Sequence, residues 1–141
     1  MTEKYYFDTC IWRDHYENRF GQGGRPLGAI ASRLFLKFMK EKKPILFSEF
    51  NLRELKKDYS EAEINDMLSV LFIADKLQKV PITKQDVEEA HKLSTDRNIS
   101  FGDCLHAVLA RNNNAILVTQ NVRDFERLTD VVNYKKPENL L

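Results

Sequence analysis

Residues 5–10 read YYFDTC, a short aromatic run that leads into the acidic residue Asp8 and then Thr9. Apolar runs of this length, bounded by polar residues, are typical of buried strands, and threonine is a frequent helix cap. The segment therefore predicts a buried strand that ends at Asp8 and is followed at once by a helix that Thr9 caps.

Two further segments repeat this arrangement. Residues 45–49, ILFSE, are an apolar run that passes into Ser48, a helix cap, and Glu49. Residues 115–124, AILVTQNVRD, contain a third run, which leads to Asp124. Strands that alternate with helices favour a parallel sheet covered by helices on both faces. We predict an α/β fold of three layers, α/β/α, around a central, mostly parallel sheet.

Apolar periodicity and capping residues predict the other elements. A stripe with four-residue spacing predicts a helix from Ile30 to Met39, and a capping box at 60–63, SEAE, begins another helix. Residues 21–28, GQGGRPLG, are expected to form a flexible loop. The remaining expectations are a short strand around 78–82, a helix opened by Thr83, a helix over 101–112 and a final strand over 131–133.

The helix-rich stretch 48–98 is a candidate for a projecting arm or partner surface, and we expect a homodimer interface there.

The composition limits the number of domains and the kind of surface. The 141 residues, 43% of them apolar, suffice for one domain, which we expect to span residues 1–141. The 22 basic and 21 acidic residues leave a net charge of +1, so any basic surface must be local.

The sequence also predicts the compartment. No stretch approaches the roughly eighteen apolar residues of a membrane span, and the first residues lack the apolar run of a signal peptide. We therefore expect a cytoplasmic protein that does not associate with membranes. Cys10 and Cys104 are too few for a zinc set or a disulfide framework, and we expect both to be reduced and packed.

Four acidic residues stand at predicted strand ends or in first helical turns: Asp8, Glu49, Asp103 and Asp124. Strand C-termini and helix N-termini share one edge of a parallel sheet, so the four carboxylates can converge there. Each acid taken singly is also explained by helix capping, which stabilises a helix by about 0.3–1 kcal/mol. Converging carboxylates repel one another unless a cation neutralises them, which predicts Mg²⁺ or Mn²⁺.

Four segments together resemble the PIN domains, and in particular the VapC-type toxin ribonucleases. They are 7–10 (FDTC), 48–50 (SEF), 102–107 (GDCLHA) and 117–125 (LVTQNVRDF). The segments occur in the family's order and span nearly the whole chain. The resemblance implies a PIN-like fold and a Mg²⁺- or Mn²⁺-dependent endoribonuclease that hydrolyses RNA phosphodiester bonds. It also implies the toxin of a VapBC-type pair, with a small antitoxin protein as partner.

The resemblance also assigns the site. It makes the four acids catalytic and metal-binding, with Asp124 completing the metal's shell or helping a second ion to bind. Many relatives have an aspartate where this chain has Asn121, so the choice between Asn121 and Asp124 as the residue nearer the metal stays open. The supporting residues, which orient carboxylates or waters, are Thr9, Thr119 and Asn121.

Contacts to the substrate are expected from arginine side chains. Arginine grips phosphate through two nitrogens, although an isolated arginine is more often a solvated surface residue. His106 follows Asp103 by one helical turn and is either a general base or a packed, hydrogen-bonded histidine. We favour packing, because water activated by a metal needs no such base. The candidate phosphate contacts are Arg13, Arg25, Arg53 and Arg123.

Two other functions compete with the nuclease. A catalytically silent PIN-like domain that binds RNA or protein has no need to hold four acids together. A phosphate-binding response domain of the doubly wound type also carries acids at strand ends, but it requires a lysine near the phosphorylated aspartate. The turn after the final predicted strands offers no clear lysine for this role.

Overall fold

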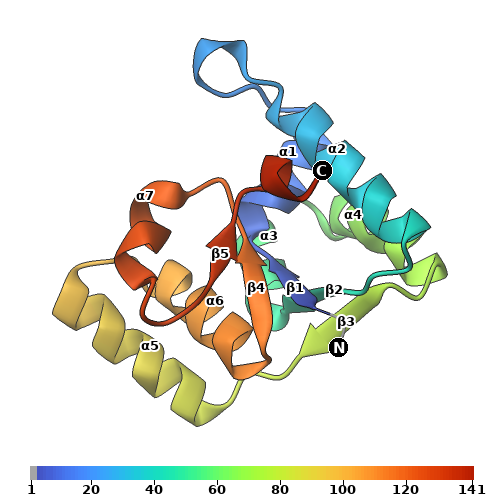
Figure 1. Ribbon diagram of the computed structural model, residues 1–141. Coiled ribbons are helices and arrows are strands. Elements are labelled where there is room, and N and C mark those ends of the chain that lie inside the picture. Colours follow the sequence, from blue (N-terminus) through green and yellow to red (C-terminus); the bar gives the residue numbers. More distant parts are fainter. Residues whose placement is uncertain (1–2) are drawn as a thin grey trace.

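Five parallel strands form one sheet in the computed structural model, which describes residues 3–141 apart from the side chains of Val70 and Ile73 (Figure 1). The strands are β1 Lys4–Phe7, β2 Ile45–Ser48, β3 Leu77–Val80, β4 Ala115–Val118 and β5 Tyr134–Lys135. Their order across the sheet is β3-β2-β1-β4-β5, and each neighbouring pair is parallel. The α/β prediction is confirmed, and the described sheet is parallel throughout.

Helices cover both faces of this sheet (Figure 1). One face packs on α1, α2 and α4, and the other packs on α5 and α6, as the two separate core clusters show. The helices are α1 Thr9–Glu17, α2 Leu27–Lys40, α3 Glu49–Leu55, α4 Glu61–Ile73, α5 Lys84–Arg97, α6 Phe101–Asn112 and α7 Val122–Phe125. Short 3-10 turns occupy Gln22–Gly24, Glu126–Leu128 and Pro137–Leu140.

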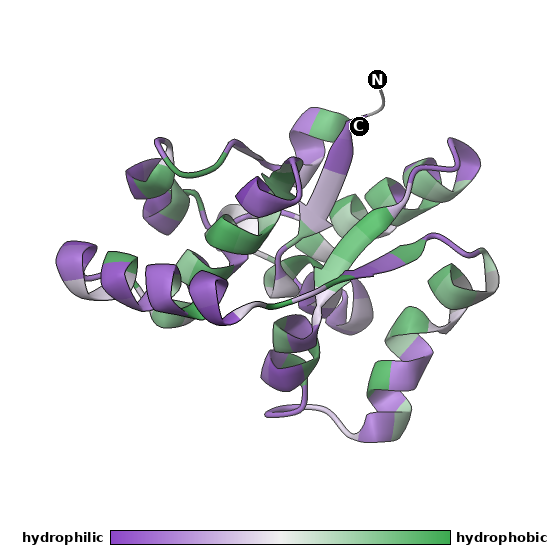
Figure 2. Ribbon diagram, turned by 90° about the horizontal axis from the view of Figure 1, so that it is seen from below, coloured by the Kyte–Doolittle hydropathy of each residue, from purple (hydrophilic) through white to green (hydrophobic). Residues whose placement is uncertain are grey.

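The central strand β1 divides the two cores by the alternation of its side chains. Tyr5 and Phe7 point into the cluster with α1 and α2, where the Phe7 ring lies 5.3 Å from that of Phe38. Tyr6 points to the opposite face, into the cluster with α6. Burying a side chain such as Phe7 stabilises the fold by about 1.5–3 kcal/mol. The middle strands are accordingly hydrophobic, whereas the exposed helix α5 is mostly hydrophilic (Figure 2).

The helix caps are mostly those expected from the sequence. Ser60, Thr83 and Ser100 each accept a hydrogen bond from a backbone N–H three residues further on. The prediction that Thr9 caps α1 is wrong: Asp8 is the N-cap, and its carboxylate accepts the Thr9 N–H at 2.8 Å. The hydroxyl of Thr9 is therefore free to contact other residues.

Two predictions about the outer parts of the fold are corrected. The last strand begins at Tyr134, beyond the predicted 131–133, because Val131 and Val132 turn inward to the core before pairing with β4 begins. The stretch 48–98 does not form a single arm: Met67 of α4 packs in one core and Ala90 of α5 in the other. The edge strand β3 separates these two helices in the chain.

The segment that does project is the loop between α1 and α2 (Figure 1). Gly23 and Gly24 have φ values of 66° and 76°, a region that glycine adopts without strain. At the base of the loop, a Cβ on Gly28 would lie 2.4 Å from the Cα of Asn18, so only glycine fits there. No helix within residues 3–141 combines the length and apolar character needed to cross a bilayer.

Candidate active site

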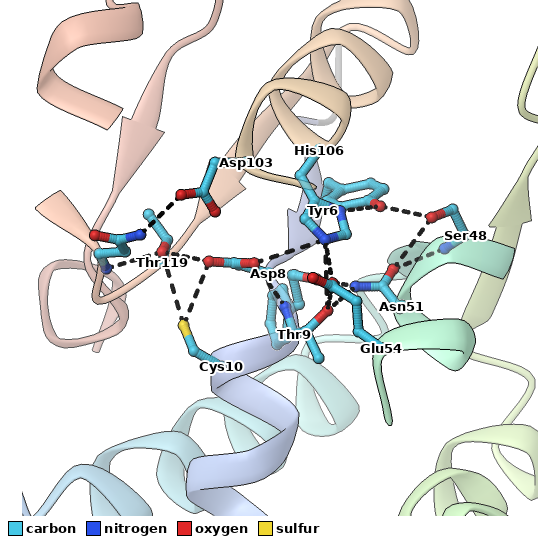
Figure 3. Close-up of polar contacts among 12 residues, drawn as sticks. Tyr6, Asp8, Thr9, Cys10, Ser48, Asn51, Glu54, Asp103, His106 and Thr119 are labelled. Atoms are coloured by element: carbon cyan, nitrogen blue, oxygen red, sulfur yellow. Dashed lines mark hydrogen bonds and ion pairs between the residues drawn. The ribbon is translucent and has the colours of Figure 1, made fainter. Parts of the chain in front are cut away.

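The centre of the candidate site is Asp8, at the carboxyl end of β1. Its backbone N–H donates to the carbonyl of Val118, which places Asp8 beside Thr119 at the end of the neighbouring strand β4. Thr119 Oγ1 donates to Asp8 Oδ2 at 2.7 Å, and both side chains are buried (Figure 3). Crevices at the carboxyl edge of an open parallel sheet, where the chain order reverses, are the usual ligand sites of such folds.

Two further acids approach this edge from α6 and α7. The Asn121 side-chain amide donates to Asp103 Oδ2 and to Asp124 Oδ2, each at 3.2 Å. The backbone N–H of Asn121 in turn donates to Thr119 Oγ1 at 2.9 Å. The amide of Asn121 thus holds two carboxylates side by side, and Thr119 connects this pair to Asp8.

Negative charge is concentrated among these three acids. Burial, the adjacent Asp124 carboxyl and the charge of Asp8 raise the pKa of Asp103 to about 7. The hydrogen bond from the Asp103 carboxyl lowers the pKa of Asp124, which is more exposed. Asp103 therefore keeps its proton to a higher pH than Asp124 does, which is the response expected of crowded carboxyls. We call Asp8, Asp103 and Asp124 the acidic triplet.

A second group of polar side chains adjoins the triplet, and hydrogen bonds connect its members. Thr9 Oγ1 donates to Glu54 Oε1 at 2.6 Å, and His106 Nε2 lies 2.6 Å from the same oxygen (Figure 3). His106 Nδ1 lies 2.7 Å from the Tyr6 hydroxyl, which is also 2.7 Å from Ser48 Oγ. We call Thr9, Glu54, His106, Tyr6 and Ser48 the buried network.

Glu54 and His106 stabilise each other's charged form. Burial would raise the pKa of Glu54, but the hydrogen bond and the charge of His106 lower it. Burial would likewise lower the pKa of His106, but Glu54 and the nearby charge of Asp8 raise it. His106 Nε2 lies 3.9 Å from Asp8 Oδ1, so this histidine joins the buried network to the acidic triplet. His106 is thus buried and hydrogen-bonded, the alternative that we favoured from the sequence.

Glu49 is the predicted acid that the structure does not bring to the triplet. Its carboxylate pairs with Lys79 Nζ at 2.5 Å, and its side chain is 46% exposed. Glu54 lies five residues further along α3, about 140° away around the helix axis, and faces the site instead. The helix pattern carried the signal that was missed: Asn51 and Leu55 are the buried residues of α3, and Glu54 lies on their side.

The four candidate arginines fall into two groups. Two are engaged within the chain: Arg13 donates to Asp58 Oδ2 and to the carbonyl of Glu54, and Arg25 pairs with Glu138. Two others are exposed near the site: Arg53 lines a hollow beside Glu49, and Arg123 is close enough to Asp124 to help lower its pKa.

Both cysteines are free, as predicted. Cys10 lies close to the acidic triplet, with its Sγ 3.5 Å from Asp8 Oδ2 and 3.7 Å from Thr119 Oγ1. Burial and the charge of Asp8 raise the pKa of this thiol well above its usual value. Cys10 is therefore a thiol, not a thiolate, near neutral pH, and it acts as a weak donor to Asp8.

The donor atoms of the triplet suit a hard divalent cation. Within residues 3–141, no three histidine, cysteine, aspartate or glutamate side chains are arranged as a complete ion site. Mg²⁺ does not require one, because it binds through one or two carboxylates and keeps several of its waters. The oxygens that fit such an ion best are those of Asp8, Asp103 and Asp124, whose mutual repulsion it would relieve.

Comparison with known proteins gives one family and several related folds. The family model for the PIN domain matches residues 5–131. Similar solved structures include VapBC2 from Rickettsia felis bound to a DNA fragment from its promoter, with a TM-score of 0.65 and 20% identity over 94% of this chain and 97% of that chain. DNA-bound VapBC from Salmonella typhimurium gives a TM-score of 0.63 and 18% identity over 96% and 99% of the two chains.

A third similar structure is a toxin–antitoxin complex from Klebsiella pneumoniae, with a TM-score of 0.65 and 16% identity over 95% of this chain and 98% of that chain. At these identities the likeness shows a shared fold, with nearly all of each chain aligned. No curated protein matches the sequence significantly.

Proposed function

The chain belongs to the PIN domain family, and from this premise we propose that it is a metal-dependent endoribonuclease that hydrolyses RNA phosphodiester bonds. The observation that carries the proposal is the convergence of Asp8, Asp103 and Asp124 at the carboxyl edge of the sheet. Holding three acids together, two of them bridged by the amide of Asn121, costs stability, and a domain that only binds RNA or protein has no need of such a cluster.

Mg²⁺ or Mn²⁺ is the proposed cofactor, with Asp8, Asp103 and Asp124 as the residues that would hold it. When bound, such an ion neutralises charge on the phosphate and activates the attacking water. Glu54 replaces Glu49 in this proposal, because its carboxylate is held by Thr9 and His106 next to Asp8. Glu49 faces Lys79 on another side of the same helix.

The remaining residues fix the orientation of these carboxylates. Thr119 donates to Asp8 and accepts from the backbone of Asn121, so one hydroxyl sets the position of two elements. Asn121 keeps Asp103 and Asp124 together through its amide. In this proposal Asn121 orients the two carboxylates, and Asp124 supplies the negative charge that the metal requires. Preorganised groups of this kind lower the cost of reorganisation in the reaction.

The biological setting that we propose is a toxin–antitoxin pair. The similar structures from Rickettsia felis, Salmonella typhimurium and Klebsiella pneumoniae are VapBC or toxin–antitoxin complexes, and their folds align with nearly all of this chain. A small antitoxin would then bind this chain and block the site. A cytoplasmic location and a homodimer belong to the same proposal.

The test is cleavage of total cellular RNA by the purified protein with Mg²⁺ or Mn²⁺, followed by mapping of new 5′ ends. Total RNA is suitable because a narrow specificity would be missed with a single model substrate. Asp103→Asn and EDTA serve as inactive controls, and Asp96→Asn, an exposed acid on α5, is the matched variant that should stay active. Discrete cuts that disappear in both inactive controls are expected; no cuts by folded, inhibitor-free protein would favour a catalytically silent domain that binds RNA or protein.

A further inference from the structure

A hollow lies beside the candidate active site, between α3, the end of β3, α5 and α6. Its volume is about 670 Å³, within the range of roughly 300–1,000 Å³ that small-molecule sites occupy. Its walls are largely apolar, with Phe50, Ile82 and Phe101 among them, and charged side chains stand with them. Neither the acidic triplet nor the buried network uses this space.

The hollow and the acidic triplet share the first turn of α6. Phe101 lines the hollow, and Asp103, two residues later, belongs to the triplet. A Cβ on the intervening Gly102 would lie 3.2 Å from Glu54 Oε2 and 3.2 Å from Phe50 Cε2. This turn therefore touches the site on one side and the wall of the hollow on the other.

Phe50 is the partition between the two spaces. Its ring packs edge-on against Phe101, with centroids 5.8 Å apart, and against His106 of the buried network, with centroids 5.3 Å apart. A ligand in the hollow is thus separated from the catalytic machinery by the thickness of one aromatic ring. A linear ligand that bound at the acidic triplet and in the hollow at once would pass over the first turn of α6.

The charge at the hollow is suited to an anion. Arg53 and Lys79 line it, with Glu49 as the acidic residue among the described lining side chains. The hydrogen bond and the charge of Lys79, with the charges of Lys56 and Arg53, lower the pKa of Glu49, so positive charge outweighs this one carboxylate. A phosphate group suits these basic side chains, because arginine and lysine both bind phosphate strongly.

The aromatic residues at the hollow favour a planar ligand. The exposed ring of His91 stacks on Phe101 with the centroids 4.2 Å apart and the planes 25° from parallel. Proteins that bind single-stranded nucleic acid use such platforms, on which an unpaired base stacks while cations track its backbone. A base within a duplex cannot enter a hollow of this shape, since its faces are already stacked.

We infer that the hollow binds an unpaired base of the RNA strand, next to the phosphate held at the acidic triplet, with Arg53 and Lys79 contacting the strand's backbone. The inference rests on the proposed nuclease function for its substrate, and it adds a site that sets which sequences are cut. His91 and Phe101 supply the stacking surface, and Phe50 separates the base from Glu54 and His106.

The first test is equilibrium binding of a fluorescein-labelled, random-sequence single-stranded RNA in EDTA, where cleavage is not required. His91→Ala, Arg53→Gln and Lys79→Gln change exposed side chains, so the fold should be unaffected. Each is expected to raise Kd about tenfold, the size expected for loss of one base stack or phosphate contact. Arg33→Gln and Lys40→Gln, exposed cations of α2 on the opposite layer, are matched controls that should bind as the wild type does. Equal Kd values for all five variants would overturn the inference.

Cleavage mapping separates this inference from the proposed function. If the wild type cuts RNA but His91→Ala and Arg53→Gln cut the same sites at the same rate, the hollow is not a base site although the nuclease stands. If the wild type does not cut RNA but its affinity depends on His91 and Arg53, the nuclease proposal fails and RNA binding by the hollow stands. If these variants keep their RNA affinity and lose binding of an antitoxin peptide, the hollow is a protein site and the inference is overturned.

Discussion

The acidic triplet and the buried network lie side by side, yet their charges are arranged in opposite ways: like charges adjoin in the triplet, and opposite charges pair in the network. In the triplet, Asp103 and Asp124 face each other across the amide of Asn121, and burial together with the neighbouring Asp124 and Asp8 carboxyls raises the pKa of Asp103. In the network, the carboxylate of Glu54 faces His106, and each stabilises the charge of the other. One half gathers carboxylates beside one another, whereas the other pairs its carboxylate with a histidine.

This difference indicates separate roles for the two groups: the triplet binds a ligand, and the network holds side chains in position. A carboxylate cluster without a cation costs stability, so it is retained for what it binds. A hydrogen-bonded network fixes positions, because each of its side chains is held by a partner. We therefore expect substitutions in the triplet to affect activity and metal binding, and substitutions in the network to affect activity and stability together.

Asp8→Asn is expected to have the largest effect, because it removes the central charge of the triplet while keeping the hydrogen bond that Thr119 donates. RNA cleavage should fall by about 10³-fold, which corresponds to about 4 kcal/mol of transition-state stabilisation. The Tm in EDTA should stay within a few degrees of the wild type. Steady-state cleavage rates measured beside the exposed-acid variant Asp96→Asn provide the check, and near-normal activity would remove Asp8 from the site.

A pair of variants on α3 compares the two glutamates. Glu54→Gln should lower cleavage by about 10²-fold and lower the free energy of unfolding by about 1–3 kcal/mol, because it leaves the buried His106 without its charged partner. Glu49→Gln should keep cleavage and tighten RNA binding, since it frees Lys79. Cleavage assays and denaturant unfolding of both proteins decide this, and the opposite pattern would restore Glu49 as the catalytic acid.

Asp14 provides a buried carboxyl outside both halves. Burial, with Glu17 and Asp8 adding to it and Arg19 opposing it, raises its pKa to about 6. The folded state binds this proton more tightly than the unfolded state does, so Asp14 costs no stability below about pH 4, and the cost grows until about pH 6. Asp14→Asn should therefore raise the free energy of unfolding by about 2 kcal/mol at pH 8 and have little effect at pH 4. Unfolding curves at the two pH values test this, and an equal effect at both would contradict it.

Asp103→Asn should have a smaller effect on stability, and one that depends on the metal. In EDTA at pH 8 it relieves repulsion and should raise the free energy of unfolding by about 1 kcal/mol, since Asp103 is partly exposed. In Mn²⁺ the wild type gains stability from binding, and the variant should gain less. Asp96→Asn, the exposed acid on α5, is the control, because its effect should be the same in both conditions. If Asp103→Asn stabilises the protein equally in EDTA and in Mn²⁺, the triplet does not bind the metal, and the proposed difference between triplet and network is contradicted.

The sequence was sufficient for most of the elements and for the three acids of the triplet. Asp8, Asp103 and Asp124 are recognisable because an apolar run or a capping residue precedes each of them, and their convergence follows from a parallel sheet. The same spacing could not decide between Glu49 and Glu54, because the choice depends on the rotation of α3 about its axis. That rotation is set by Asn51 and Leu55, which are buried against other elements.

Other errors have similar causes. Thr9 and Asp8 are both good caps, and only the backbone conformation at Asp8, extended at φ −60° and ψ 150°, decides which one begins the helix. The buried network was not predicted either, because Tyr6, Ser48 and His106 are far apart in the chain and meet through the packing of α6 on the sheet. Long-range contacts between single polar residues leave no periodic pattern in a sequence.

The central claim, that the acidic triplet binds a divalent cation, is tested most directly by anomalous diffraction at the manganese edge from crystals grown in Mn²⁺. Crystals of Asp8→Asn, grown in the same way, are the control. We predict a manganese peak bounded by the carboxylates of Asp8 and Asp103 in the wild type and its loss in the variant. A peak at Glu49, or none between Asp8 and Asp103 at saturating Mn²⁺, would contradict the claim.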